Sequence, residues 1–160
     1  MLKIIFLDID GVLNDRQSKS RCRGFIGIDD DKVKRLWEIV TATNAKIVLC
    51  SSWKSGWELQ DKDSQNELAN YLDRKLKREG LFLIDKTKDS GSDRGNGIIK
   101  WLETKNVSSW IVLDDEIFSD YEECGIIPYL IKTSFYCERG GLQPEHVDKA
   151  IQLLRGVVNE

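Results

Sequence analysis

The alternation of short apolar runs with segments of helical periodicity constrains the fold of this chain most strongly. The runs are apolar over their whole length, which is typical of strands buried on both faces of a parallel sheet. We expect strands near residues 2–9, 46–50, 81–84, 110–113 and 128–131, and helices at 29–43, 64–80, 98–102 and 144–154. The pattern predicts a three-layer, Rossmann-like α/β fold, in which helices cover both faces of a parallel sheet of about five strands.

Length and composition exclude several classes of protein. A chain of 160 residues fits one domain, and its net charge of −3 gives no overall attraction to nucleic acid. No apolar run has the length of a membrane span, and the first strand begins directly after Met1, so we expect no signal peptide and a cytoplasmic location. The four cysteines form no C-x-x-C pair and there is one histidine, which argues for reduced thiols and against a zinc site.

Acidic and hydroxyl side chains follow three of the predicted strands at the point where each strand ends. They are Asp8 and Asp10, then Ser51 and Ser52, then Asp114 and Asp115. Because the carboxyl ends of parallel strands meet at one edge of the sheet, we expect these side chains to lie together. Carboxylates from two strands fit a hard cation such as Mg²⁺, and hydroxyl groups fit phosphate oxygens.

Three of these strand ends resemble motifs of the haloacid dehalogenase (HAD) superfamily of phosphohydrolases. The segment Phe6-Leu7-Asp8-Ile9-Asp10-Gly11-Val12-Leu13-Asn14 resembles the first motif. Residues 47–51, an apolar strand that ends in Ser51, resemble the second motif. Residues 110–115 resemble the fourth motif in its form with two consecutive aspartates. The order of these elements along the chain is similar to that of the superfamily throughout.

The third HAD motif is a Lys or Arg near the start of the helix that precedes the last of these strands. Arg94 fits it best, and Lys88 and Lys100 are the alternatives. The sequence Ser-Ser-Trp-Lys at residues 51–54 also resembles the small HAD domains that are grouped with nucleic-acid repair proteins.

The resemblance implies a Mg²⁺-dependent phosphatase that works through an aspartyl-phosphate intermediate. It implies that Asp8 is the nucleophile and that Asp10 is the general acid and base. The implied metal ligands are Asp8, the backbone carbonyl of Asp10, and Asp115, with Asp114 orienting the metal site. The implied phosphate-binding residues are Ser51, Ser52 and Arg94. Asp10 also favours a phosphatase over a dehalogenase, because family phosphatases carry their acid at this position.

HAD enzymes usually select substrates with a cap domain, and this chain has no room for one. Only about twenty residues separate Asp10 from the next helix, and the gap after Ile84 is shorter. We therefore expect a single HAD-like domain over residues 1–160 with no large cap and a mobile loop at residues 15–28 over the site. This loop carries Arg16, Lys19, Arg21 and Arg23, which would attract a polyanion.

An open site of this kind fits a large substrate, and a phosphorylated polynucleotide end is our leading expectation. A phosphatase of small metabolites, such as nucleotides or sugar phosphates, is one alternative. An inactive HAD-like binding module is another, against which the complete set of Asp8, Asp10 and Asp115 argues. The sequence predicts neither the oligomeric state nor the pathway.

Some residues near the predicted site have two interpretations. Asp120 is either a further motif acid or a carboxylate at a helix start. Trp53 and Trp57 either pack in the core or stack on a base or sugar, whereas Trp37 fits the core face of its helix. Residues 91–97 lack a phosphate-loop pattern, so a flexible loop is expected there.

Overall fold

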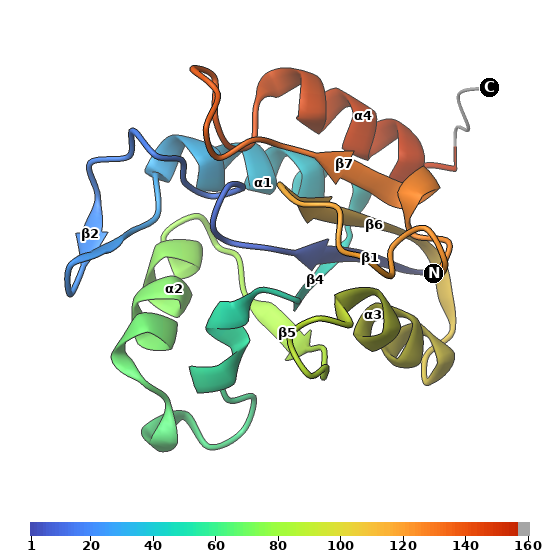
Figure 1. Ribbon diagram of the computed structural model, residues 1–160, viewed down its shortest axis with the longest axis horizontal. Helices are drawn as coiled ribbons and strands as arrows, with labels where there is room; N and C mark the ends of the chain where they lie inside the picture. The colour runs from blue at the N-terminus through green and yellow to red at the C-terminus, as the bar shows by residue number, and fades with distance from the viewer. Residues whose placement is uncertain (157–160) are drawn as a thin grey trace.

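A parallel sheet of five strands lies between two layers of helices in the computed structural model, which describes residues 1–156 (Figure 1). The strands are β1 (Leu2–Leu7), β4 (Lys46–Leu49), β5 (Leu83–Lys86), β6 (Val107–Asp114) and β7 (Leu130–Lys132). They are ordered β5-β4-β1-β6-β7, so the first strand of the chain lies at the centre. The predicted three-layer α/β fold is confirmed, and all four strand pairs of this five-stranded sheet are parallel.

Alternate residues of the central strand point to opposite hydrophobic clusters, as strand geometry requires. Ile5 and Leu7 join one cluster, and Ile4 and Phe6 join the other. The first cluster is completed by α1 (Asp30–Thr43), α2 (Glu67–Lys77) and α4 (Pro144–Leu154). The second is completed by α3 (Arg94–Glu103) and the segment after β6. Within residues 1–156, no helix is long and apolar enough to cross a membrane.

Several predicted boundaries are wrong by two or three residues. β5 begins at Leu83 because Phe82, although apolar, is 63% exposed beside the edge of the sheet. β7 begins at Leu130, since the preceding residues Ile127–Tyr129 form a short 3₁₀ helix around a proline. Trp37 was also expected in the core and is 44% exposed on α1.

Helix α2 begins later than its sequence pattern predicts. The spacing Ser64-x-x-Glu67 is a capping-box pattern, but the side chain that accepts the hydrogen bond from the Ala69 amide, at 2.8 Å, is that of Asn66. The Ser64 hydroxyl instead donates to the carbonyl of Asp61 and belongs to the 3₁₀ helix Lys62–Ser64. Both Ser64 and Asn66 are residues of a type that caps helices, and the capping-box spacing favours Ser64, which is not the cap.

The segment at residues 15–28, expected as a loop, contains a β-hairpin. Strand β2 (Arg21–Cys22) pairs antiparallel with β3 (Phe25–Ile26). The two residues between them, Arg23 and Gly24, have φ of 49° and 82°, which is the backbone of a type I′ turn. Figure 1 shows this hairpin at the same end of the molecule as the loop that follows β7.

Helix α3 starts inside the segment that was expected to be a flexible loop. The carboxylate of Asp120 accepts hydrogen bonds from the amides of Gly95 and Asn96, at 3.0 and 2.9 Å. A Cβ at position 95 would lie 2.8 Å from an Asp120 oxygen, so a side chain there would displace this carboxylate. Asp120 is thus an anchor for the first turn of α3, and it fixes where Arg94 enters the site.

Candidate active site

A pocket of about 500 Å³ opens at the carboxyl ends of β1 and β6. The Asp8 amide donates to the carbonyl of Leu113 at 3.0 Å, which holds the ends of these two strands together. The Asp8 side chain is nearly buried and Asp114 is fully buried. The charged residues that line the pocket are Asp8, Asp10, Arg94, Asp114, Asp115 and Glu116.

Three of these carboxylates form a tight group. One oxygen each of Asp8, Asp114 and Asp115 lies within 4.8 Å of the other two. Burial raises the pKa of Asp8 well above its ordinary value, and the charge of Asp114 raises it further. Burial also raises the pKa of Asp115 to about 6. Negative charge is therefore crowded here, and an all-oxygen set of this kind fits Mg²⁺.

A glycine lets the end of β1 approach Asp115. Gly11 has a φ of 85°, and a Cβ there would lie 2.3 Å from the Asp115 carboxyl carbon. Any side chain at position 11 would therefore displace this carboxylate from the group. This contact explains the glycine that follows the two aspartates of the first motif.

Arg94 supplies positive charge to the carboxylate group. Its Nη1 atom lies 2.9 Å from Asp114 Oδ2 and 3.3 Å from Asp8 Oδ1. Its guanidinium also lies over the Phe118 ring, 4.1 Å from the centroid. The other two candidates for the third motif, Lys88 and Lys100, are exposed and do not line this pocket. Of the three candidates, Arg94 is the one that contacts the carboxylates.

Asp114 uses both carboxylate oxygens within the protein. Besides Arg94, its Oδ2 accepts a hydrogen bond from the Tyr121 hydroxyl at 2.7 Å. Its Oδ1 accepts from the Glu116 amide at 3.1 Å. Asp114 thus holds Arg94 in position from within the three-carboxylate group. Tyr121 carries no motif that would have identified it from the sequence.

Asp10 lies at the pocket surface and is exposed, outside the three-carboxylate group. Its Oδ1 accepts a hydrogen bond from Asn14 Nδ2 at 2.9 Å, and its Oδ2 accepts from Trp53 Nε1 at 3.1 Å. These two donors fix the orientation of the carboxylate. Trp53 and Trp57 are both buried and pack in the first hydrophobic cluster, and Trp53 also lines the pocket.

The two serines after β4 are placed differently. Ser51 is 1% exposed, and its hydroxyl oxygen accepts a hydrogen bond from the Trp53 amide at 3.1 Å. It thereby caps the 3₁₀ helix η1 (Ser52–Gly56). Ser52 is exposed and lines the pocket, whereas Ser51 is not among the described residues that do.

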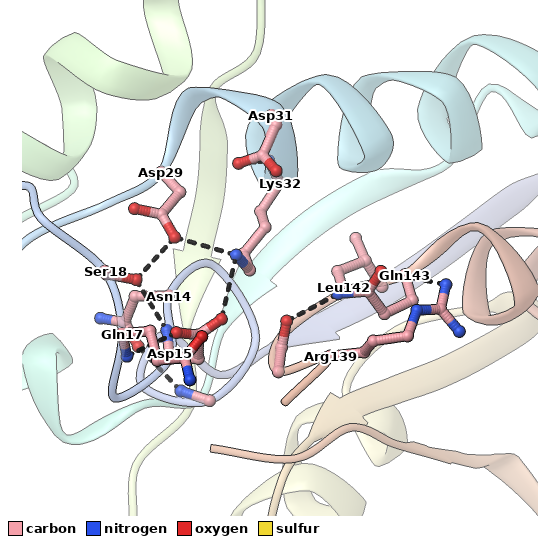
Figure 2. A network of polar contacts seen from close by, with 12 residues as sticks. Asn14, Asp15, Gln17, Ser18, Asp29, Asp31, Lys32, Arg139, Leu142 and Gln143 are labelled. Atoms are coloured by element: carbon pink, nitrogen blue, oxygen red, sulfur yellow. Dashed lines mark hydrogen bonds and ion pairs between the residues drawn. The ribbon is translucent and has the colours of Figure 1, made fainter. Parts of the chain in front are cut away.

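A buried ion network joins the segment before the hairpin to the start of α1 (Figure 2). Lys32 Nζ lies 2.9 Å from Asp29 Oδ2 and 3.3 Å from Asp15 Oδ2. The Ser18 hydroxyl donates to the same Asp29 oxygen at 2.6 Å. Next to this network, the Arg16 amide donates to the carbonyl of Phe135 at 3.0 Å. The network thus joins the base of the hairpin, the start of α1 and the loop that follows β7.

Replacing Lys32 with Met is expected to destabilise the protein by about 3 kcal/mol, because it leaves Asp15 and Asp29 without their cation. Chemical denaturation with a spectroscopic probe measures this change. The matched control is Lys34→Met in the same helix, whose exposed side chain contributes little. Equal stabilities of the two variants would contradict the structural role of the network.

A family model described as the HAD domain in Swiss Army Knife RNA repair proteins matches residues 4–147. The matched range contains the hairpin, the pocket and all the strands except the first two residues of β1. No curated protein matches the chain.

Proposed function

The chain belongs to the family of HAD domains in Swiss Army Knife RNA repair proteins, and from this premise we propose that it is a Mg²⁺-dependent phosphatase of phosphorylated nucleic-acid ends. The observation that carries the proposal is the group of Asp8, Asp114 and Asp115 beside Arg94, at the joined ends of β1 and β6. A phosphoryl group is anionic and a phosphatase must hold it beside an anionic nucleophile. A site with several carboxylates, one arginine and room for a cation suits that task.

In the proposed reaction, a carboxylate oxygen of Asp8 attacks phosphorus and the bond from phosphorus to the leaving oxygen breaks. Asp10, protonated at that moment, gives its proton to the leaving oxygen. A water molecule then attacks the aspartyl-phosphate and gives a proton to Asp10. This step releases inorganic phosphate and restores both carboxyl groups. The two hydrogen bonds to Asp10 keep its carboxylate oriented at the pocket surface.

The proposed ligands of Mg²⁺ are Asp8, Asp115 and the backbone carbonyl of Asp10. Asp114 is proposed to orient this metal site. When bound, Mg²⁺ supplies positive charge that shields the nucleophile from the charge of the phosphate. Burial first, and then the charge of neighbouring carboxylates, raises the pKa of both Asp8 and Asp115, and a cation bound between them would offset both effects. Arg94 supplies a fixed positive charge 3.3 Å from Asp8 Oδ1.

The proposed substrate rests on three observations. The family description names RNA repair proteins. The chain carries a short hairpin and no cap domain between β1 and α1, so the pocket is open to a large substrate. The hairpin strand β2 and the segment before it also carry exposed basic residues, namely Arg21 in β2 and Arg16 and Lys19 before it.

Removal of metal is expected to abolish the activity. With Mg²⁺ the protein should hydrolyse a generic aryl phosphate, and chelation by EDTA should lower the rate at least about 100-fold. Mg²⁺ should also raise the melting temperature, since it binds the folded state at the crowded carboxylates. Full activity in EDTA would contradict the metal requirement, and activity on no phosphate ester would favour the inactive binding module.

The substrate class has a separate test. We expect 3′- or 5′-phosphorylated oligonucleotides to be hydrolysed with a higher kcat/KM than a panel of nucleotides and sugar phosphates. If the small metabolites are turned over and the oligonucleotides are not, the chain is a metabolite phosphatase with the same chemistry.

A further inference from the structure

The mouth of the pocket is lined by aromatic side chains from two segments far apart in the sequence. Phe25 comes from β3 of the hairpin, and Phe135 and Tyr136 come from the loop that follows β7. Phe25 is 63% exposed and Tyr136 is 73% exposed. Single exposed apolar residues are common on protein surfaces, but these two converge on one pocket that holds the proposed phosphate site.

The hairpin wall of this mouth is held firmly in place. The Asn14 side chain donates to the carbonyl of Gly27 at 2.8 Å, and the Ile28 amide donates to the Tyr71 hydroxyl at 3.0 Å. At the tip, Arg23 forms an ion pair with Glu67 at the start of α2. Phe25 directly follows this anchored turn, so its exposed side chain projects from a backbone whose position is well defined.

The second wall is anchored through the network of Figure 2. The Phe135 carbonyl accepts the hydrogen bond from the Arg16 amide, and Gly141 donates to the Ser134 carbonyl at 2.7 Å. Gly140 packs directly against Asp15 of the network, where a Cβ would lie 2.4 Å from the Asp15 Cβ. The hairpin is tied to the same network, because Arg21 Nη1 donates to the carbonyl of Ser18 at 2.6 Å and the Ser18 hydroxyl donates to Asp29.

We propose that Phe25 and Tyr136 form a stacking site for the terminal base of a single-stranded, phosphorylated nucleic-acid end. The inference rests on the proposed function, because the base is placed by the phosphate bound at Asp8 and Arg94. Aromatic faces bind bases by stacking, and nearby cations bind the phosphates of the adjoining nucleotides. Here the exposed cations Arg16, Lys19 and Arg21 precede the aromatic hairpin strand, which is the combination that a polynucleotide needs.

The test compares two oligonucleotide substrates that differ only in the terminal residue, which carries either a base or an abasic sugar. For the wild-type protein, loss of the base should raise KM about tenfold with little change in kcat. Phe25→Ala and Tyr136→Ala should each raise KM about tenfold for the substrate with a base and leave the abasic substrate unaffected. Phe25→Tyr and Tyr136→Phe should keep the wild-type KM, because stacking needs only the ring.

Phe82→Ala is the matched control. Phe82 is also 63% exposed, but it directly precedes the edge strand β5 and lines a different pocket. Equal KM values for the two substrates in the wild-type protein would overturn the stacking site and leave the proposed phosphatase intact. If Phe25→Ala raises KM equally for the substrate with a base and for the abasic substrate, or equally for a phosphopeptide, the stacking site would also be overturned.

A second measurement does not depend on catalysis. A 2-aminopurine base at the phosphorylated end should lose fluorescence on binding to the wild-type protein in EDTA, and Phe25→Ala and Tyr136→Ala should reduce this quenching. Quenching without hydrolysis of any phosphate ester in Mg²⁺ would refute the proposed reaction while retaining the stacking site. Absence of quenching in a bound complex would refute the stacking site.

Discussion

Replacing Asp8 with Asn is expected to lower kcat by at least about 10⁴-fold, the largest effect that we expect from any single substitution in this protein. The amide has nearly the shape of the carboxylate but no anionic oxygen to attack phosphorus. Steady-state hydrolysis of an aryl phosphate in saturating Mg²⁺ measures the loss. Asp148→Asn on the exposed face of α4 makes the same chemical change away from the pocket and should retain the wild-type rate.

The same Asp8→Asn substitution should raise the melting temperature of the metal-free protein. Burial raises the pKa of Asp8, so the charged form is less stable in the folded chain than in the unfolded one. Below the ordinary pKa of 3.8 both states are protonated and this penalty is absent, and it grows as the pH rises toward the folded-state pKa. The gain from Asn should therefore be present at pH 7 and vanish near pH 3. Wild-type turnover by a folded Asp8→Asn protein would refute the proposed mechanism.

Replacing Arg94 with Ala should lower both activity and stability. The substitution leaves Asp8 and Asp114 buried beside each other without their cation, which costs about 3–5 kcal/mol. For a chain of this size, that corresponds to a fall of at least about 6 °C in the melting temperature. Loss of a fixed positive charge at the phosphoryl group should also lower kcat about 10²–10³-fold.

The controls for Arg94→Ala test whether its effects arise from the contacts of Arg94 with the carboxylates or from removing any cation of α3. Lys100→Ala changes an exposed cation on the same helix and should leave both quantities unchanged. Adding Asp114→Asn to Arg94→Ala should recover part of the stability, because one of the unpaired charges is removed, but none of the activity. If Lys88→Ala or Lys100→Ala loses activity while Arg94→Ala retains it, the third motif has been assigned to the wrong residue.

The sheet and the carboxylate group were predictable because both depend on strands with a continuous apolar run, at residues 4–7 in β1 and 110–113 in β6. β1 and β6 are recognisable from composition alone, and parallel pairing brings their ends together. Asp8, Asp114 and Asp115 therefore had to meet if the fold class was correct. The residue of the third motif could be narrowed only to three candidates. They lie in or next to a predicted loop, and a loop has no regular repeat from which the direction of a side chain can be predicted.

The parts that escaped prediction depend on single side-chain contacts. The start of α3 is set by Asp120, a residue more than twenty positions away in sequence, and the start of α2 by a choice between Asn66 and Ser64. The hydrogen bond from Trp53 to Asp10 joins residues that no periodicity connects. The hairpin has strands of two residues each, too short for alternation to appear. Its Arg-Gly turn was the available signal.

The central position of β1 has a consequence for how the chain is made. This strand pairs with β4 on one side and β6 on the other, and about a hundred residues separate it from β6. At typical rates of synthesis, β1 waits on the order of 5–20 s for that second neighbour to leave the ribosome. During this interval an apolar strand has unpaired edges that favour association with other nascent chains. Asp8 and Asp10, still hydrated, then place two negative charges at its end and oppose that association.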